Sequence, residues 1–189
     1  MRTLKTGVFG GAVLIIAVWT GGAAQADERR VTVCTEGLAG FRAAAPALPI
    51  AASMFAAAGI RVDWRDQLKG CPPQGVLVTL GQRTPPEFHP GAFAYASPFE
   101  GAHIRIFYDR VAARGIALMP HLLAHVLVHE ITHILQGVTR HSAEGVMKAH
   151  WNQEDLSSML QKTLEFTNLD VDLIHDGVAA RDKAMVAVK

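Results

Sequence analysis

The segment 120–136 is the feature that most constrains how this chain folds. Its residues are almost all apolar or histidine, and Pro120 and Gly137 stand where a helix typically begins and ends. A helix that is apolar on every side is expected to lie buried at the centre of a fold, under a sheet. Glu130 lies within it, and because burying a carboxylate without a task is costly, the sequence predicts a functional role for this residue.

Two of the histidines in this segment have the spacing of metal ligands. His129 and His133 are one helical turn apart, so both side chains project from one face and can hold one ion. Neutral imidazole nitrogen is a good zinc ligand, and a catalytic zinc site uses three protein ligands and leaves the fourth position to water. Glu130 is placed to take a proton from that water. The motif predicts one Zn²⁺ per chain on His129 and His133, with Glu130 as the general base.

A third ligand is expected just downstream of this helix. Gly137 can adopt the left-handed conformation that ends a helix and turns the chain back, which brings His141 toward the metal. We therefore predict His141 as the third ligand, against the alternative of a solvated loop histidine. A second alternative is a gluzincin-type site, in which Glu154 from a downstream helix is the third ligand and Asp155 orients a zinc histidine.

The remaining histidines are not predicted to be metal ligands. His121 and His125 continue the one-turn spacing, but one ion is reached from only about two successive turns of a helix. We expect His125 to be a core residue or to support a ligand, and His121 to lie on the surface. Three further histidines are expected to be ordinary polar residues: His89, His103 and His175.

The order of the other elements predicts the fold class. Alternating or short apolar runs predict strands at 30–35, 60–64, 75–80 and 102–108, and the segment 85–98 reads as a loop or an irregular edge strand. Helices are expected at 43–58, 120–136, 152–161 and 168–184. This order indicates an α+β or α/β-like fold in which a small, twisted, mixed β-sheet is backed by helices.

The stretch from His129 to Met147 resembles the metzincin clan of zinc peptidases. Those proteins have a long zinc-binding motif, a glycine turn, a third histidine and then a turn that contains methionine, which Gly145-Val146-Met147 resembles here. The loop is two residues longer than usual, because the glycine and the histidine follow the second zinc histidine at four and eight positions rather than three and six. The chain is also similar to small exported bacterial proteins with a comparable motif. Where several metzincins place a tyrosine that stabilises the oxyanion, this chain offers His150.

The first residues predict export. Arg2 and Lys5 precede an apolar run and small residues, which is the pattern of a cleavable signal peptide at 1–26, followed by one domain at 27–189. Loss of these two cations changes the formal charge from +1 to −1, which argues against nucleic acid as a partner. A secreted or periplasmic location favours a disulfide between Cys34 and Cys71. No stable membrane span is expected after signal removal, and the sequence does not predict the oligomeric state.

These observations together predict a secreted zinc metallopeptidase that acts on a protein or peptide substrate. The metzincin resemblance implies that the substrate lies along an edge of the sheet. The aromatic loop 85–100 is either a rim of that binding site or a covered edge. The alternatives are a catalytically inactive exported domain that binds zinc or protein, and a structural domain whose histidines bind nothing. The presence of Glu130 argues against the catalytically inactive zinc-binding domain, since metal binding alone does not need that carboxylate.

Overall fold

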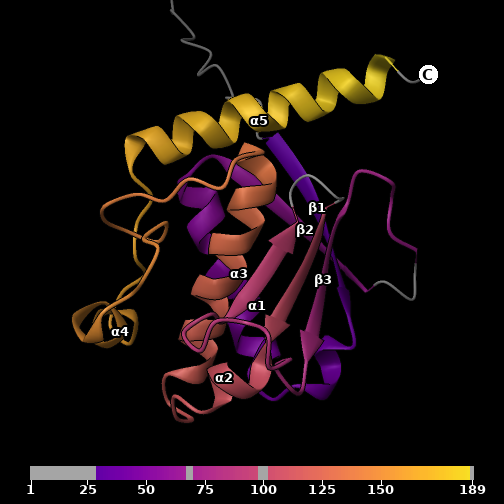
Figure 1. Ribbon diagram of the computed structural model, residues 1–189. Coiled ribbons are helices and arrows are strands. Elements are labelled where there is room, and N and C mark those ends of the chain that lie inside the picture. The colour runs from indigo at the N-terminus through magenta and orange to yellow at the C-terminus, as the bar shows by residue number, and fades with distance from the viewer. Residues whose placement is uncertain (1–28, 67–69, 98–101, 188–189) are drawn as a thin grey trace, which may run out of the picture.

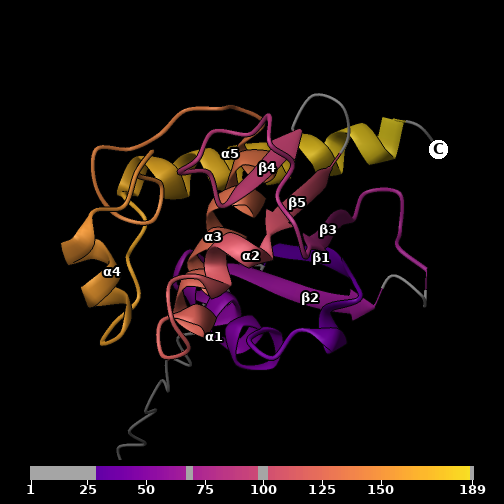
Figure 2. The same ribbon diagram turned by 60° about the horizontal axis from the view of Figure 1, so that its bottom comes forward.

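A five-stranded mixed sheet forms the framework of the computed structural model (Figure 1), which describes residues 29–66, 70–97 and 102–187. The strand order is β2-β1-β3-β5-β4. Four strands are parallel, and only β4 runs antiparallel, against β5. The bounds are β1 Arg29–Glu36, β2 Ile60–Asp66, β3 Val76–Gly81, β4 Ala94–Ser97 and β5 His103–Phe107. The predicted strands are thus confirmed, and the segment predicted as a loop or edge strand contains the short edge strand β4 (Figure 2).

Parallel neighbours on both sides explain the apolar character of the inner strands. Val33 of β1 pairs in register with Trp64 of β2 and Val76 of β3, and both valines are fully buried. The next residue, Cys34, forms a disulfide with Cys71, with 5.8 Å between the Cα atoms, so the predicted bond is confirmed. It ties the connection between β2 and β3 to the inner strand β1.

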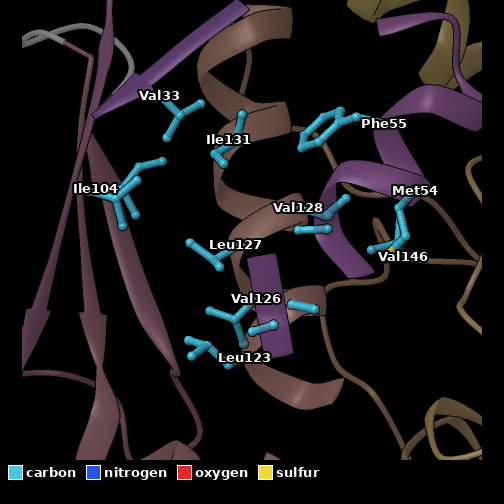
Figure 3. Close-up of a cluster of buried hydrophobic side chains, with 14 of the residues drawn as sticks. Val33, Met54, Phe55, Ile104, Leu123, Val126, Leu127, Val128, Ile131 and Val146 are labelled. Atoms are coloured by element: carbon cyan, nitrogen blue, oxygen red, sulfur yellow. The ribbon is translucent and has the colours of Figure 1, made fainter. Parts of the chain in front are cut away.

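The helix that carries the histidines is buried between the sheet and another helix. This helix is α3 (Met119–Gln136), and it packs against α1 (Ala44–Ala57). Figure 3 shows Leu127 and Ile131 on the side of α3 that faces the sheet, and Val128 on the side that faces α1. All three are fully buried. The prediction of a central, all-round apolar helix is therefore confirmed.

The last helix crosses the C-terminal end of α3 (Figure 1). This helix, α5, spans Asn168–Ala187, and α4 spans Gln153–Met159. The crossing is close at Gly177, where a Cβ atom would lie 1.8 Å from the carbonyl oxygen of Leu135. Only glycine therefore fits this position of α5 without a backbone shift.

Two short elements were not predicted from the sequence, η1 (Leu38–Gly40) and α2 (Tyr108–Ala112). In the described part of the chain, no helix is long and apolar enough to cross a bilayer. The predicted signal peptide, 1–26, lies outside the described residues.

Candidate metal site

The structure brings the three predicted ligands together. Two lie on α3, where the Nε2 atoms of His129 and His133 are 3.1 Å apart, and the third, His141, lies on the loop that follows. One ring nitrogen from each of the three falls within 4.8 Å of the other two. In the described ranges, no other group of His, Cys, Asp or Glu side chains converges in this way.

Backbone carbonyls set the orientation of the two helical imidazoles. Nδ1 of His129 lies 2.9 Å from the carbonyl oxygen of Val146, and Nδ1 of His133 lies 3.1 Å from that of Val138. A carbonyl oxygen can only accept, so each Nδ1 carries the proton and each Nε2 keeps a free lone pair. Two lone pairs facing each other at 3.1 Å repel unless a cation lies near both.

That separation fits a zinc ion. Two nitrogens bound to zinc at about 2.0–2.1 Å with tetrahedral angles lie about 3.3 Å apart. The observed separation of 3.1 Å is close to this value. The ring centroid of His141 is 5.2 Å from that of His129 and 4.9 Å from that of His133, so the third side chain stands beside both. The donor set therefore suits the metal that the sequence predicts.

Desolvation favours the neutral, metal-binding form of the buried His129 and His133, and it acts in the same direction on the exposed His141. Desolvation, together with the neighbouring His133, lowers the pKa of His129 to about 3. The pKa values of His133 and His141 are also lowered, again mainly by desolvation. Metal ligation requires the deprotonated nitrogen, so no proton has to be removed at neutral pH.

Glu130 lies beside these histidines, and the pKa of its carboxyl group is shifted from the ordinary value. It is half-buried on α3 and lines the same cleft as the three histidines. Desolvation raises the pKa of its carboxyl to about 7. A carboxylate with a pKa near the working pH can both accept and return a proton, which is the property expected of a general base.

The loop that carries His141 is held by its own backbone and by the segment before α5. Gly137 adopts the left-handed conformation (φ 66°), as predicted, and ends α3. Further on, the N–H of Ser142 donates to the carbonyl of Met147 at 2.8 Å. Gly145 also has a positive φ (74°), and a Cβ atom there would lie 2.2 Å from the carbonyl oxygen of Glu165. Met147 itself is fully buried.

Asp170, which the sequence analysis missed, fixes both neighbours of His141. Its Oδ1 atom accepts hydrogen bonds from Arg140 at 2.8 Å and from Ser142 at 2.7 Å. Its Oδ2 atom accepts from the N–H and the hydroxyl of Thr167. The side chain is fully buried, and although desolvation raises its pKa, the hydrogen bonds from Ser142, Thr167 and Arg140 outweigh this and lower it overall.

The contacts between Asp170 and Thr167 can be recognised from the local sequence. Thr167 and Asp170 have the spacing of a capping box, and the Asp170 N–H donates to the Thr167 hydroxyl at 3.2 Å. That spacing predicts the start of α5. It does not predict the contacts with Arg140 and Ser142, because these residues are about 30 positions away in the sequence.

Other predicted candidates lie outside the group of three converging histidines. His125 is fully buried, donates through Nδ1 to the carbonyl of His121 and accepts the N–H of Leu164 through Nε2, so it is a core residue with both ring nitrogens in use. Glu154 is exposed in the first turn of α4. Asp155 caps that helix and pairs with Lys148 at 2.5 Å.

A cleft of about 490 Å³ opens over the three histidines and Glu130. His150 lines it, as does His89, which was expected to be an ordinary polar residue. The aromatic loop has two roles, since Phe93 and Tyr95 line the cleft whereas the Phe88 ring packs on Phe107 with 4.7 Å between centroids.

Comparison with known proteins shows the same fold in one solved structure. No family model and no curated protein matches the chain. The crystal structure of archaemetzincin from Methanopyrus kandleri matches with a TM-score of 0.57 and 14% sequence identity, over 82% of this chain and 99% of that one. The fold is similar to that of archaemetzincin. At this identity the likeness concerns the fold, and the predicted α+β class with a mixed sheet and helices is confirmed.

Proposed function

We propose that this protein is a zinc-dependent peptidase in which His129, His133 and His141 hold the metal and Glu130 is the general base. The observation that carries the proposal is the pair of Nε2 lone pairs, 3.1 Å apart, whose orientation is fixed by Nδ1 contacts to backbone carbonyls. The archaemetzincin-like fold supports it, since the name of that neighbour agrees with the metzincin resemblance of the motif.

The residues of the cleft supply the steps around the metal. Bound zinc would acidify a water molecule and polarise the substrate carbonyl. Glu130, whose pKa lies at about 7, takes the proton of the attacking water and returns it to the leaving amine. His150 lines the same cleft and is the candidate for stabilising the oxyanion. The carbonyls of Val138 and Val146 keep the two imidazoles in the tautomer that the metal requires.

The edge strand β4 provides a place for an extended substrate. In the sheet as described, β4 pairs with β5 on one side only, and its residues Ala94, Tyr95 and Ala96 line the cleft. An extended peptide can add to such an edge through main-chain hydrogen bonds. This arrangement favours a protein or peptide substrate lying along β4 above the three histidines.

We also propose that the protein acts outside the cytoplasm, after removal of residues 1–26. The Cys34–Cys71 disulfide supports this, because such bonds persist mainly in oxidising compartments. The second candidate function is an inactive zinc-binding or protein-binding domain. The half-buried Glu130 favours the peptidase, because metal binding alone does not need that carboxylate.

Zinc content and proteolysis, measured together, test the proposal. We expect about one zinc per chain in the purified protein by elemental mass spectrometry, and cleavage of casein that a chelator abolishes. His141→Ala is expected to weaken zinc binding, whereas Glu130→Gln is expected to keep the zinc and lose cleavage by a factor of at least about 100. The matched control is His103→Ala, which removes an exposed histidine outside the cleft.

The outcomes separate the candidates. Absence of zinc after reconstitution would overturn the metal site. A full zinc complement without cleavage of any protein or peptide would support the inactive binding domain instead.

A further inference from the structure

The cleft does not end at the metal site. A second hollow of about 380 Å³ adjoins it, and Arg114 lines both. The second hollow is largely apolar, and its lining includes Ile116 and Leu160, whose exposed fractions are 69% and 48%. Arg114 therefore lies between the cleft of the histidines and the second hollow.

Aromatic rings connect this arginine to the metal site. The guanidinium carbon of Arg114 lies 5.3 Å from the ring centroid of Phe93. Phe93 stacks on Trp151 with 6.5 Å between centroids, and Trp151 meets the ring of His129 edge-on at 5.6 Å. The contact with Phe93 holds the cation over an aromatic ring without using its N–H donors, which can therefore bind a ligand.

The charge of Arg114 is not neutralised within the described part of the chain. No carboxylate of those residues lies within ion-pair distance of it, in contrast to Lys148, which lines the same cleft and pairs with Asp155 at 2.5 Å. Glu130 is the one acidic residue among the cleft-lining residues described. A substrate that enters this cleft meets an exposed cation without an acidic partner.

We propose that Arg114 is a specificity residue that binds a carboxylate of the peptide substrate. The inference rests on the proposed peptidase function and names the substrate class: peptides with an Asp or Glu side chain a few residues from the cleaved bond. A guanidinium is suited to this because its planar fork donates two parallel hydrogen bonds to a carboxylate.

The second hollow favours a side chain over a chain terminus as the source of that carboxylate. If the substrate ended at Arg114, the apolar surface formed by Ile116 and Leu160 would have nothing to bind. An internal acidic residue lets the chain continue past Arg114 and place its next residues on that surface.

Paired fluorogenic peptides test the inference. Each pair consists of one C-terminally amidated peptide with Glu at a scanned position and the same peptide with Gln there. A third peptide carries Gln and a free C-terminal carboxylate. An ion pair with the exposed Arg114 side chain corresponds to a preference of about twofold to fivefold in kcat/KM for Glu over Gln at one position. Arg114→Gln is expected to reduce that ratio to about one. Arg114→Glu is expected to reverse the preference, so that a further peptide with Lys at the same position is cleaved better than the Glu peptide.

The control is Arg83→Gln, which removes an exposed arginine outside the cleft and is expected to keep the wild-type preference. A Glu to Gln ratio near one in the wild type at every position, or a preference that survives in Arg114→Gln, would overturn the inference. A preference only for the free C-terminus would overturn the assignment to a side chain.

The same peptides are also measured for binding by fluorescence anisotropy, which does not need turnover. If no peptide is cleaved but the Glu peptides bind more tightly and lose this advantage in Arg114→Gln, the proposed peptidase fails and the carboxylate site stands. Equal binding of the Glu and Gln peptides would remove the site whether or not the protein is a peptidase.

Discussion

Replacing Asp170 by Asn should both destabilise the protein and weaken its metal site. The carboxylate accepts four hydrogen bonds, two on each oxygen, from Arg140, Ser142 and Thr167. An amide has one accepting oxygen, so its NH₂ group must face donors on one side, and the charge that pairs with Arg140 disappears. Because Asp170 is fully buried, water does not replace these contacts.

The size of the effect follows from these contacts. Removing one partner of a fully buried ion pair costs about 3–5 kcal/mol. The Arg140 side chain is 34% exposed and keeps part of its hydration, so we expect a loss of about 3 kcal/mol. For a chain of this size, that corresponds to a decrease in Tm of about 6–12 °C. Zinc affinity should also fall, since Arg140 and Ser142 flank His141 and must compete with Thr167 for the one accepting oxygen that remains.

The assay is thermal unfolding of the wild type and Asp170→Asn in the presence of a chelator, followed by zinc titration of each by competition with a chromogenic chelator. Ser142→Ala, which removes one of the four hydrogen bonds, should lower the stability by only about 1 kcal/mol. Asp172→Asn, an exposed carboxylate on the same helix, is the matched control. A chelated Tm of Asp170→Asn within about 1 °C of the wild type, together with unchanged zinc affinity, would refute the reasoning.

Three further predictions concern Gly177, the disulfide and the pH dependence of the Asp170 contribution. Gly177→Ala should lower the free energy of unfolding in urea by about 3 kcal/mol, because the added Cβ atom would lie 1.8 Å from the Leu135 carbonyl oxygen. A gain in stability, which is the usual result of Gly→Ala within a helix, would contradict the close crossing of α5 and α3. Reduction of the Cys34–Cys71 bond, which spans 37 positions, should cost about 3–4 kcal/mol measured by the same method, and an unchanged midpoint would show that the loop it closes adds no constraint. The pKa of Asp170 in the folded state lies below its ordinary value of 3.8. Its contribution to the free energy of unfolding is therefore present above pH 4 and is lost as the pH falls through the folded-state pKa. The wild type and Asp170→Asn should converge in stability in that pH range, and a constant difference between them would exclude this linkage.

The elements predicted from the sequence were those whose signal is local. The helix of His129 and His133 is recognised within one segment, from the one-turn spacing of its histidines and from the proline and glycine at its two ends. The turn at Gly137 needs only the conformational freedom of glycine. The convergence of His141 with the other two followed from that turn. The strands were likewise recognised from short apolar runs between turn residues.

The features that were missed depend on contacts between distant segments. Asp170 reaches Arg140 and Ser142 only because α5 crosses the end of α3, and nothing in the sequence near any of these residues predicts that crossing. Arg114 is one of many arginines in the sequence, and its position at the cleft depends on the turn between α2 and α3. Such residues become visible only when the packing of the helices is known.

The dependence of the two imidazoles on backbone carbonyls has a consequence for how this site can vary. Val138 and Val146 act through main-chain oxygen, so replacing either side chain leaves the acceptor in place as long as the path of the loop is kept. The exposed Val138 can therefore change to other residue types while the tautomer of His133 stays the same, whereas Val146 is fully buried in the core and is limited to apolar side chains of similar size. An inserted or deleted residue would shift the carbonyls and release the rings, so the site should tolerate a change of residue type at Val138 far better than a change in loop length.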